Sequence, residues 1–178
     1  MQAPQTDLTS VAPSSSAWYL VHTKPRQEDI ALTNLERQGY PCYLPRLQVE
    51  KVRRGKAQWV REAMFPRYLF VQLETGHQAK SWSPIRSTLG VSKLVYFGSQ
   101  PAKVDPQLID LLQSREEALP AETIFQPGDA VVITAGPFAG IEAVYQTSDP
   151  ERRSMILLEI LSKRVTMHID AGQLRKVG

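Results

Sequence analysis

The chain has 178 residues, of which 42% are apolar and 22% are charged, and its formal net charge is +3. This balance is ordinary for a globular protein, and the length suits one medium domain or two small ones. It excludes a wholly disordered, collagen-like or coiled-coil chain. The single cysteine, Cys42, excludes an internal disulfide framework and a cysteine-rich zinc site. Because no apolar run has the roughly 18 residues of a membrane span, we expect a cytoplasmic protein without a membrane contact.

The positive charge lies in the front half of the chain. Residues 17–100 hold thirteen lysines and arginines against six acids, a net charge of +7. Residues 121–178 hold six lysines and arginines against seven acids, a net charge of −1. The two halves are therefore expected to have different partners, and the front half suits a polyanion.

The front half alternates between β-type and helical patterns. Residues 1–16 are rich in serine, proline and threonine and predict a disordered tail. Residues 27–38 predict a helix that stops at a glycine, and Asp105-Pro106 begins a second helix with an apolar face. Strands are expected within 18–21, 42–52, 57–60, 68–71 and 92–98, with a short helical stretch within 81–91. These elements predict an α+β domain: one mostly antiparallel sheet with helices packed on it.

The second half of the chain reads as a small β-barrel. The polar segment 113–123 contains Pro120 and is interpreted as a linker. Short strands are expected after it at 130–133, 142–145, 154–161, 165–169 and 174–175. The segment 153–164 is ambiguous, because Ile156, Leu158 and Ile160 alternate as in a strand, while Leu157, Ile160, Leu161 and Arg164 share a helical face. Its methionine, leucine and glutamate residues favour the helix.

Glycines and alternating apolar residues form a recognisable pattern after residue 127. The glycines permit sharp turns, and the apolar residues alternate toward a barrel core. The pattern consists of Gly128, Asp129, Val131, Ile133, Gly136, Pro137, Phe138 and Gly140. It resembles a KOW motif.

Three front-half segments carry a second resemblance. Residues 18–20 (WYL), 35–38 (LERQ) and 65–71 (FPRYLFV) resemble the NusG-type N-terminal domain. That domain followed by a KOW domain is the architecture of the NusG-like transcription elongation factors. Other segments resemble the RfaH branch more than general NusG; they are 53–56, 90–91, 97–98, 101–102 and 153–158.

The resemblance covers about residues 17–177 and implies a domain organisation and a function. A disordered tail (1–16) precedes a NusG-type α/β sandwich (17–112), a linker (113–123) and a KOW domain (124–178). In the RfaH branch the KOW domain is a β-barrel or, in an autoinhibited state, an α-helical hairpin. Such proteins are operon-specific antitermination factors that bind the clamp helices and gate loop of RNA polymerase and the non-template DNA strand. They suppress pausing and termination, and their tail domain contacts the small ribosomal subunit; a monomer is expected.

The resemblance also implies roles for individual residues. The clamp-binding patch carries over to Leu20, His22, Phe65, Ile109 and Leu112, although each of these residues also suits ordinary core packing. Glu62 and Arg153 match an interdomain ion pair of the closed RfaH form. The KOW motif proper is carried by Gly128, Asp129, Gly136, Phe138 and Gly140.

Contacts with DNA and with the gate loop carry over to a second group of residues. The DNA-facing candidates are Lys24, Arg26, Arg86 and Thr88. The gate-loop candidates are Ser81, Trp82 and Ser83, of which Trp82 either stacks on a base or packs inside. Leu89 stands where RfaH proteins commonly carry an arginine, so the usual recruitment element is not implied. The tip Arg53 to Lys56 is either a phosphate contact or a solvated hairpin end.

Catalysis is not indicated by any motif. His22, His77 and His168 are isolated, and the sequence holds no phosphate-binding loop and no nucleophile elbow. We therefore expect a binding protein, not an enzyme, with no cofactor and no metal. Two alternatives within the binding class stay open: a general NusG-type elongation factor and a KOW-bearing ribosome-associated protein.

Overall fold

The computed structural model describes residues 15–76, 79–118 and 140–174. Its centre is an antiparallel sheet in the order β2 (Cys42–Tyr43), β5 (Tyr68–Thr75), β1 (Ser15–Thr23), β6 (Val91–Leu94). A short strand, β9 (Lys103–Val104), pairs with β1 beside β6. The aromatic and branched residues of β1 and β5 explain why these two strands form the long central pair.

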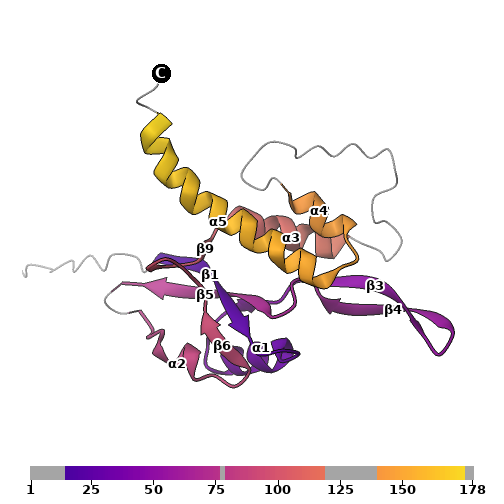
Figure 1. Ribbon diagram of the computed structural model, residues 1–178. Helices are drawn as coiled ribbons and strands as arrows, with labels where there is room; N and C mark the ends of the chain where they lie inside the picture. The colour runs from indigo at the N-terminus through magenta and orange to yellow at the C-terminus, as the bar shows by residue number, and fades with distance from the viewer. Residues whose placement is uncertain (1–14, 77–78, 119–139, 175–178) are drawn as a thin grey trace, which may run out of the picture.

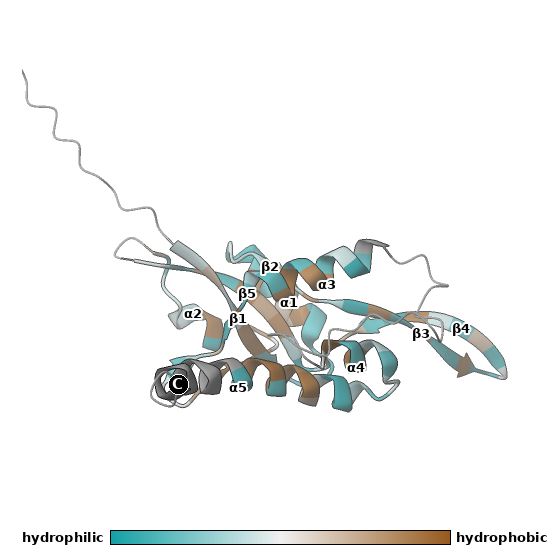
Figure 2. Cartoon of the chain, turned by 90° about the horizontal axis from the view of Figure 1, so that it is seen from above, coloured by the Kyte–Doolittle hydropathy of each residue, from teal (hydrophilic) through white to brown (hydrophobic). Residues whose placement is uncertain are grey.

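Helices cover both faces of this sheet. The helices α1 (Glu28–Arg37) and α2 (Ser83–Arg86) lie on one face. The helices α3 (Pro106–Ala118), α4 (Ile141–Gln146) and α5 (Pro150–Leu174) lie on the other (Figure 1). Seen from above, α3 and α5 run across the sheet, with α4 beside the first half of α5 (Figure 2). The sheet is therefore the middle of three layers.

Alternation along the central strands divides the core in two. Tyr19, Val21 and Val71 point toward α1 and α2, whereas Leu20 and Phe70 point toward α3 and α5. Successive side chains of a strand point to opposite faces, so adjacent residues of β1 and β5 join different clusters. Both faces are apolar, and each needs a cover.

A long hairpin projects from the sheet. It is formed by β3 (Arg46–Arg53) and β4 (Lys56–Ala63), which pair in register from Arg46 opposite Ala63 to Arg53 opposite Lys56. A small hairpin of β7 (Tyr96–Phe97) and β8 (Gln100–Pro101) follows β6. The turn of the long hairpin uses Arg54 and Gly55, both with positive φ.

The predicted mixed α/β fold is confirmed for the described front half, with shifted boundaries. Strand β1 begins at Ser15, inside the segment expected to be a disordered tail. Helix α3 continues to Ala118, through the first part of the expected linker at 113–123. Residues 1–14 and 119–139 lie outside the described residues, as do the KOW-motif residues Gly128, Asp129, Gly136 and Phe138.

The strands expected at 142–145, 154–161 and 165–169 are wrong for this structure. All three segments are helical, in α4 and α5. The reason is packing: spacings of three and four residues place apolar side chains of both helices against α3 and the sheet. Gly140, with a φ of 100°, immediately precedes α4. Within the described residues, no helix is long and apolar enough to cross a membrane.

Candidate functional site: an apolar face covered by the tail

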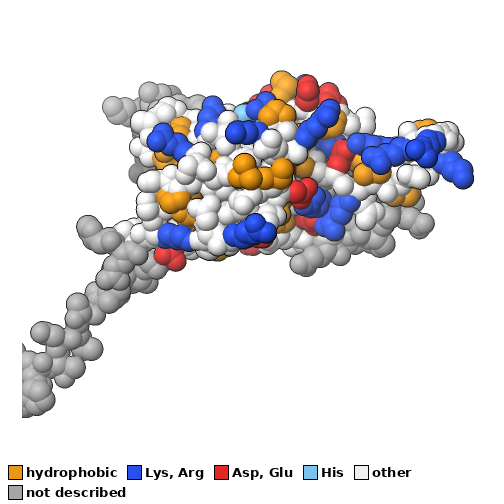
Figure 3. Space-filling model, turned by 90° about the horizontal axis from the view of Figure 1, so that it is seen from below, with side chains coloured by type: hydrophobic (Ala, Val, Ile, Leu, Met, Phe, Trp, Pro, Cys, Tyr) orange, Lys and Arg blue, Asp and Glu red, His pale blue; other side chains and the backbone are white. Residues whose placement is uncertain are grey.

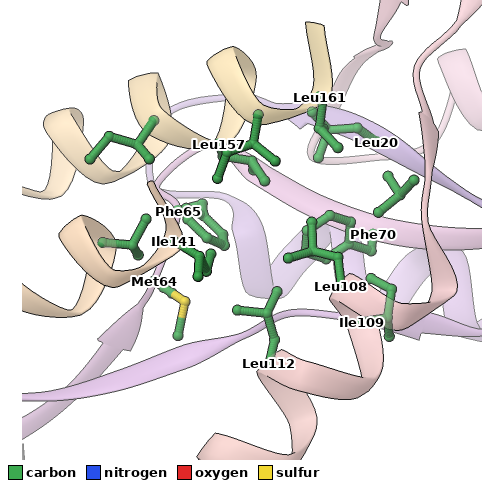
Figure 4. Packing of buried hydrophobic residues seen from close by; sticks show 14 of the residues in the cluster. Leu20, Met64, Phe65, Phe70, Leu108, Ile109, Leu112, Ile141, Leu157 and Leu161 are labelled. Atoms are coloured by element: carbon green, nitrogen blue, oxygen red, sulfur yellow. The ribbon is translucent and has the colours of Figure 1, made fainter. Parts of the chain in front are cut away.

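One face of the front domain is apolar and is buried under α4 and α5. We call this face, formed by β1, β5, α3 and the residues before β5, the covered face. Its largest buried side chains are those of Leu20, Met64, Phe65, Phe70, Leu108, Ile109 and Leu112. Four of the five expected polymerase-binding residues, Leu20, Phe65, Ile109 and Leu112, therefore share one cluster (Figure 4).

The cover is supplied by α4 and α5, the two helices of the C-terminal part of the chain, which we call the tail. In α4, Ile141, Val144 and Tyr145 are buried at helical spacing. Among the described side chains of α5, the buried apolar ones are Ile156, Leu157, Ile160 and Leu161, whereas the neighbouring Met155 is 54% exposed. Figure 4 shows Leu157, Leu161 and Ile141 beside Phe65 and Leu20. Apolar burial of this kind contributes about 1.5–3 kcal/mol per large side chain, so the cover is held mainly by apolar contact.

A fully buried arginine fixes the start of α5 on the front domain. The Arg153 guanidinium donates from Nε to the Met64 carbonyl oxygen at 2.8 Å and from Nη2 to Glu62 Oε1 at 2.9 Å. Its Nη1 donates to the Thr147 carbonyl oxygen at 3.3 Å. Beside it, Ser154 Oγ donates to the Pro66 carbonyl oxygen at 3.0 Å. The expected pair of Glu62 and Arg153 is thus in contact, and removal of Glu62 would leave the buried Arg153 charge without its ion-pair partner.

Glu62 is shared between two cations. Lys51 Nζ, from β3, lies 2.6 Å from Glu62 Oε2, while Arg153 holds the other carboxylate oxygen. Burial raises the pKa of the Glu62 carboxyl, but the hydrogen bonds and charges of Lys51 and Arg153 outweigh burial and hold the pKa below its usual value. The carboxylate is therefore ionised at neutral pH and attracts the tail.

A second set of polar contacts joins the far side of the cover to α3. Arg115 pairs with Glu142 of α4, and its guanidinium lies 4.5 Å from the centre of the Tyr145 ring. Burial raises the pKa of Tyr145 to about 12. Next to Arg115 on α3, Glu116 accepts a hydrogen bond from Tyr43 Oη at 2.6 Å and forms an ion pair with Arg61 of the hairpin at 2.6 Å. Helix α3 thus contacts both the cover and the hairpin.

His22, the fifth expected polymerase contact, lies outside the covered cluster. It is half-buried on β1, and its ring centre is 5.0 Å from that of Tyr68. Burial, together with the charges of Arg67 and Lys93, lowers the pKa of His22, so the ring is neutral at pH 7. Its Nδ1 has no hydrogen-bond partner among the described residues. An uncharged ring tilted against Tyr68 suits the edge of an apolar surface.

The expected DNA contacts differ in exposure. Lys24, Arg26 and Arg86 are exposed, and Arg26 has a φ of 61°. The Lys24 amide donates to the Gly90 carbonyl oxygen at 2.9 Å, which ties this loop to the segment after α2. Thr88, in contrast, is buried, and its hydroxyl accepts from Gln38 Nε2 and donates to the Pro84 carbonyl oxygen, both at 2.8 Å. We therefore assign Thr88 to packing and keep the three cations as candidates.

The expected gate-loop residues surround a packed tryptophan. The Trp82 ring centre lies 4.9 Å from that of Tyr19, and its Nε1 donates to the Glu74 carbonyl oxygen at 3.0 Å. Of the two alternatives for Trp82, the structure has the packed one. Ser81 and Ser83 are exposed, with 3.2 Å between their hydroxyl oxygens. These serines form the accessible polar part of the segment.

Metal-ligand geometry is not found: within the described ranges, no group of three histidine, cysteine or acidic side chains is placed to hold a metal ion. Cys42 is half-buried beside the α1 side of the sheet, and burial together with the charge of Glu36 raises its pKa to about 12. A thiol with such a pKa is a poor nucleophile at neutral pH.

Two participants of the site escaped sequence reasoning. Met64 supplies both an apolar side chain to the covered face and the carbonyl oxygen that accepts from Arg153. Lys51 shares Glu62 with the tail. A main-chain acceptor has no signal in a sequence. The pair of Lys51 and Glu62 has a weak one, because the two residues lie on one face of the predicted hairpin.

Comparison with known proteins identifies the family of the front domain. The sequence model of the family described as "Transcription termination factor nusG" matches residues 16–113, more than half of the chain. A solved structure described as "Domain interaction in Thermotoga maritima NusG" covers 70% of this chain and 76% of its own, at 22% identity and a TM-score of 0.42.

Three relatives carry the name "Transcription termination/antitermination protein NusG". The one from Thermus thermophilus is 29% identical over 91% of this chain and 99% of its own length. The one from Deinococcus radiodurans is 26% identical over 91% of this chain and 100% of its own length. The one from Escherichia coli is 26% identical over 84% of this chain and 85% of its own. The predicted NusG-type resemblance is thus confirmed at the level of the family, and this chain belongs to the NusG family.

Proposed function

We propose that this chain is a transcription elongation factor that binds RNA polymerase through the covered face. The observation that carries the proposal is that four residues implied as clamp contacts, Leu20, Phe65, Ile109 and Leu112, lie in one apolar cluster. A single-face cluster of this size is the kind of surface that binds a protein partner. In the unbound chain, α4 and α5 occupy it, so binding requires that these helices leave.

The proposal includes specialisation of the RfaH type. A factor whose polymerase-binding face is covered stays inactive until a recruitment signal removes the cover. The buried contact of Arg153 with Glu62 supports such a closed state, since it adds a specific polar tie to the apolar contacts. Released α4 and α5 are then proposed to refold as part of the KOW barrel and to contact the small ribosomal subunit.

A general NusG-type factor is the second candidate. It is favoured by the names of the three relatives, all of which are NusG, and by their match over most of their own length. A general factor acts on nearly all genes and needs an accessible polymerase-binding face. Genome-wide occupancy separates the two candidates: a few long operons for the specialised factor, nearly all genes for the general one.

Contact with the non-template DNA strand belongs to the proposal as well. Lys24, Arg26 and Arg86 are exposed cations of the front domain and suit phosphate contacts. Ser81 and Ser83 are the proposed gate-loop contacts. Leu89, 65% exposed, stands in the position of the usual arginine and points to a different base preference.

Capture by RNA polymerase tests the proposed function. Core polymerase is immobilised and incubated with the full chain or with the Arg153→Met variant, which loses the contacts to Glu62 and Met64. The proposal expects weak capture of the wild type and at least about tenfold stronger capture of the variant, since the variant loses the hydrogen bonds of Arg153 to Met64, Thr147 and Glu62 that hold α5 on the front domain. The Arg152→Met variant, which removes an exposed neighbour, is the matched control.

Two outcomes count against parts of the proposal. If neither the wild type nor the variant binds polymerase, the chain is not a polymerase-bound factor, and the ribosome-associated alternative gains weight. If both bind equally and tightly, the cover does not limit binding, and the general factor is the better description.

A further inference from the structure

The hairpin of β3 and β4 carries a concentration of positive charge. Residues 46–63 hold six lysines and arginines against two glutamates. Every residue from Lys51 to Trp59 is exposed. Figure 3 shows these cationic side chains gathered along the projecting hairpin, away from the body of the molecule. Exposure on both faces means that no packing role within the described chain explains this segment.

The register separates the hairpin into two chemically different faces. Residues directly opposite in an antiparallel pair share a face. Arg53 is opposite Lys56, and Lys51 is opposite Gln58, so three cations lie on one face, which we call the basic face. On the other face, Val52 is opposite Ala57, and Arg61 is neutralised by Glu116 of the body. Arg53 and Lys56 form no ion pair within the described part of the chain.

The basic face is connected to the tail through one carboxylate. Glu62 lies on the same face as Lys51, and its two oxygens bind Lys51 at 2.6 Å and Arg153 at 2.9 Å. Without the tail, Lys51 and Glu62 neutralise each other. With the tail docked, Arg153 supplies the countercharge of Glu62, so the group of three carries a net positive charge. Lys51 is then held less strongly and is freer to bind an anion.

We propose that the basic face binds the phosphate backbone of a nucleic-acid duplex, and that docking of α5 strengthens this binding because Arg153 neutralises Glu62. The projecting two-stranded form of the hairpin favours a nucleic acid, since a two-stranded β-ribbon fits the major groove of a duplex and brings its cations to the flanking phosphates. The proposal deepens the proposed function by adding a duplex site that the closed chain can use before its polymerase-binding face is free. By linkage, a bound duplex stabilises the closed tail to the same extent.

Fluorescence anisotropy with a labelled DNA duplex of two helical turns, at low salt, tests the site on the full chain. The variant Lys51→Gln/Arg53→Gln/Lys56→Gln is expected to bind at least about tenfold more weakly, with a flatter salt dependence, because each phosphate contact contributes about 0.9 to the slope of log K against log salt. The matched control Arg37→Gln/Lys103→Gln/Lys163→Gln removes the same charge from exposed positions elsewhere. Equal losses in the two triple variants would mean that net charge alone, and not the hairpin, binds the duplex.

A double-mutant cycle tests the link to the tail. Arg153→Gln is expected to weaken duplex binding by about two- to fivefold, the size of one partly screened charge pair. In the Glu62→Gln background, where Lys51 has no acid to pair with, the same Arg153 substitution is expected to change duplex binding by less than about twofold. An equal effect of Arg153→Gln in both backgrounds overturns the coupling, even when that substitution releases the tail.

Two further measurements separate this site from other partners and from the proposed function. Polyglutamate that displaces the duplex at equal charge concentration would assign the basic face to an acidic protein segment, contrary to the proposal. Capture by core polymerase of the Arg53→Gln/Lys56→Gln variant, which keeps the Lys51 contact with Glu62, is expected to equal that of the wild type. Failure of both the wild type and the Arg153→Met variant to bind polymerase overturns the proposed function but leaves the duplex result intact.

Discussion

The two faces of the central sheet are equally apolar but are covered in different ways. The face that carries Val21 and Val71 is covered by α1 and α2, which lie between the strands in the chain. The face that carries Leu20 and Phe70 is covered by α3 and by α4 and α5, which follow after residue 139. The first cover cannot leave without loss of the fold, because α1 and α2 each lie in the chain between two strands of the same sheet.

The contacts that hold the two covers on the sheet also differ: one cover is held by close backbone packing and the other by polar side-chain contacts in addition to apolar ones. On the α1 side, Gly90 lies so close to α1 that a Cβ atom there would be 2.7 Å from the Ala31 amide nitrogen. On the α5 side, polar ties from Arg153 and Arg115 accompany the apolar contacts. A specific buried ion pair adds little net stability but fixes one arrangement. The first cover is therefore a fixed part of the fold, which we call the permanent cover, and the second, which we call the reversible cover, docks in one defined position from which it can be released.

The largest effect is expected from a charge placed in the reversible cover. Leu157 is fully buried, so Leu157→Asp sets an unpaired carboxylate against Phe65 and should release α4 and α5 entirely. The front domain is expected to stay folded. Binding of a hydrophobic dye and the amide spectrum of the full chain measure the change.

Met155→Asp is the control for this substitution, because Met155 is the neighbouring exposed residue of the same helix. It should leave dye binding and the spectrum as in the wild type. Unfolding of the whole chain by Leu157→Asp would show that both covers are equally necessary for the fold of the front domain.

A backbone clash should break the permanent cover. Gly90 has a φ of 89°, and Gly90→Ala both strains the backbone and collides with α1, at a cost of about 2–5 kcal/mol. Thermal unfolding of the full chain measures the loss, which should involve the sheet and α1 together.

Gly98→Ala isolates the contribution of backbone strain. Gly98 has a φ of 64°, but nothing lies within 4 Å of the added Cβ atom. Its cost should be only the left-handed strain of about 1–2 kcal/mol. Equal losses at the two glycines would mean that contact with α1 is unimportant.

The elements of the front domain could be predicted from sequence, because the patterns that indicate each of them lie within its own residues. Alternation in β1 and β5, the apolar face of α1 and the Asp105 start of α3 each predict an element from its own residues. Among the expected site residues, the exposed cations and the apolar cluster members were found through the family resemblance. Which of them face one another depends on the layer order of the sheet.

The reversible side could not be predicted in the same way. Ile156 and Ile160 fit a strand as well as a helix, and the choice depends on whether the covered face is there to bury them. In the structure, Leu157 and Leu161 join them at helical spacing. A segment with two acceptable patterns takes its conformation from its partner, and no local rule decides between them.

Acid should weaken the reversible cover through Glu62. Lys51 and Arg153 hold the pKa of Glu62 below its usual value of about 4.3. The ionised carboxylate therefore stabilises the docked tail at pH values above the pKa that Glu62 has in the unfolded chain. That contribution is lost as the pH falls through the lower, folded value. Dye binding between about pH 6 and pH 3 should therefore rise in the wild type. In the Glu62→Gln variant the docked fraction should be smaller and less dependent on pH; an identical pH profile in both chains would remove Glu62 from the acid response.

The smallest effect is expected for the natural thiol on the permanent side. Because its pKa is raised to about 12, little thiolate is present at neutral pH, and Cys42 should react with a disulfide reagent at least about tenfold more slowly than an ordinary thiol. Release of the tail by Leu157→Asp should leave this rate unchanged, since Cys42 packs against the cluster on the α1 side. A thiol introduced by Ile109→Cys, on the covered face, should become reactive in the same released chain. If both thiols accelerate together, the two covers open as one unit; if only the introduced thiol does, the permanent face stays closed while the other is free for a partner.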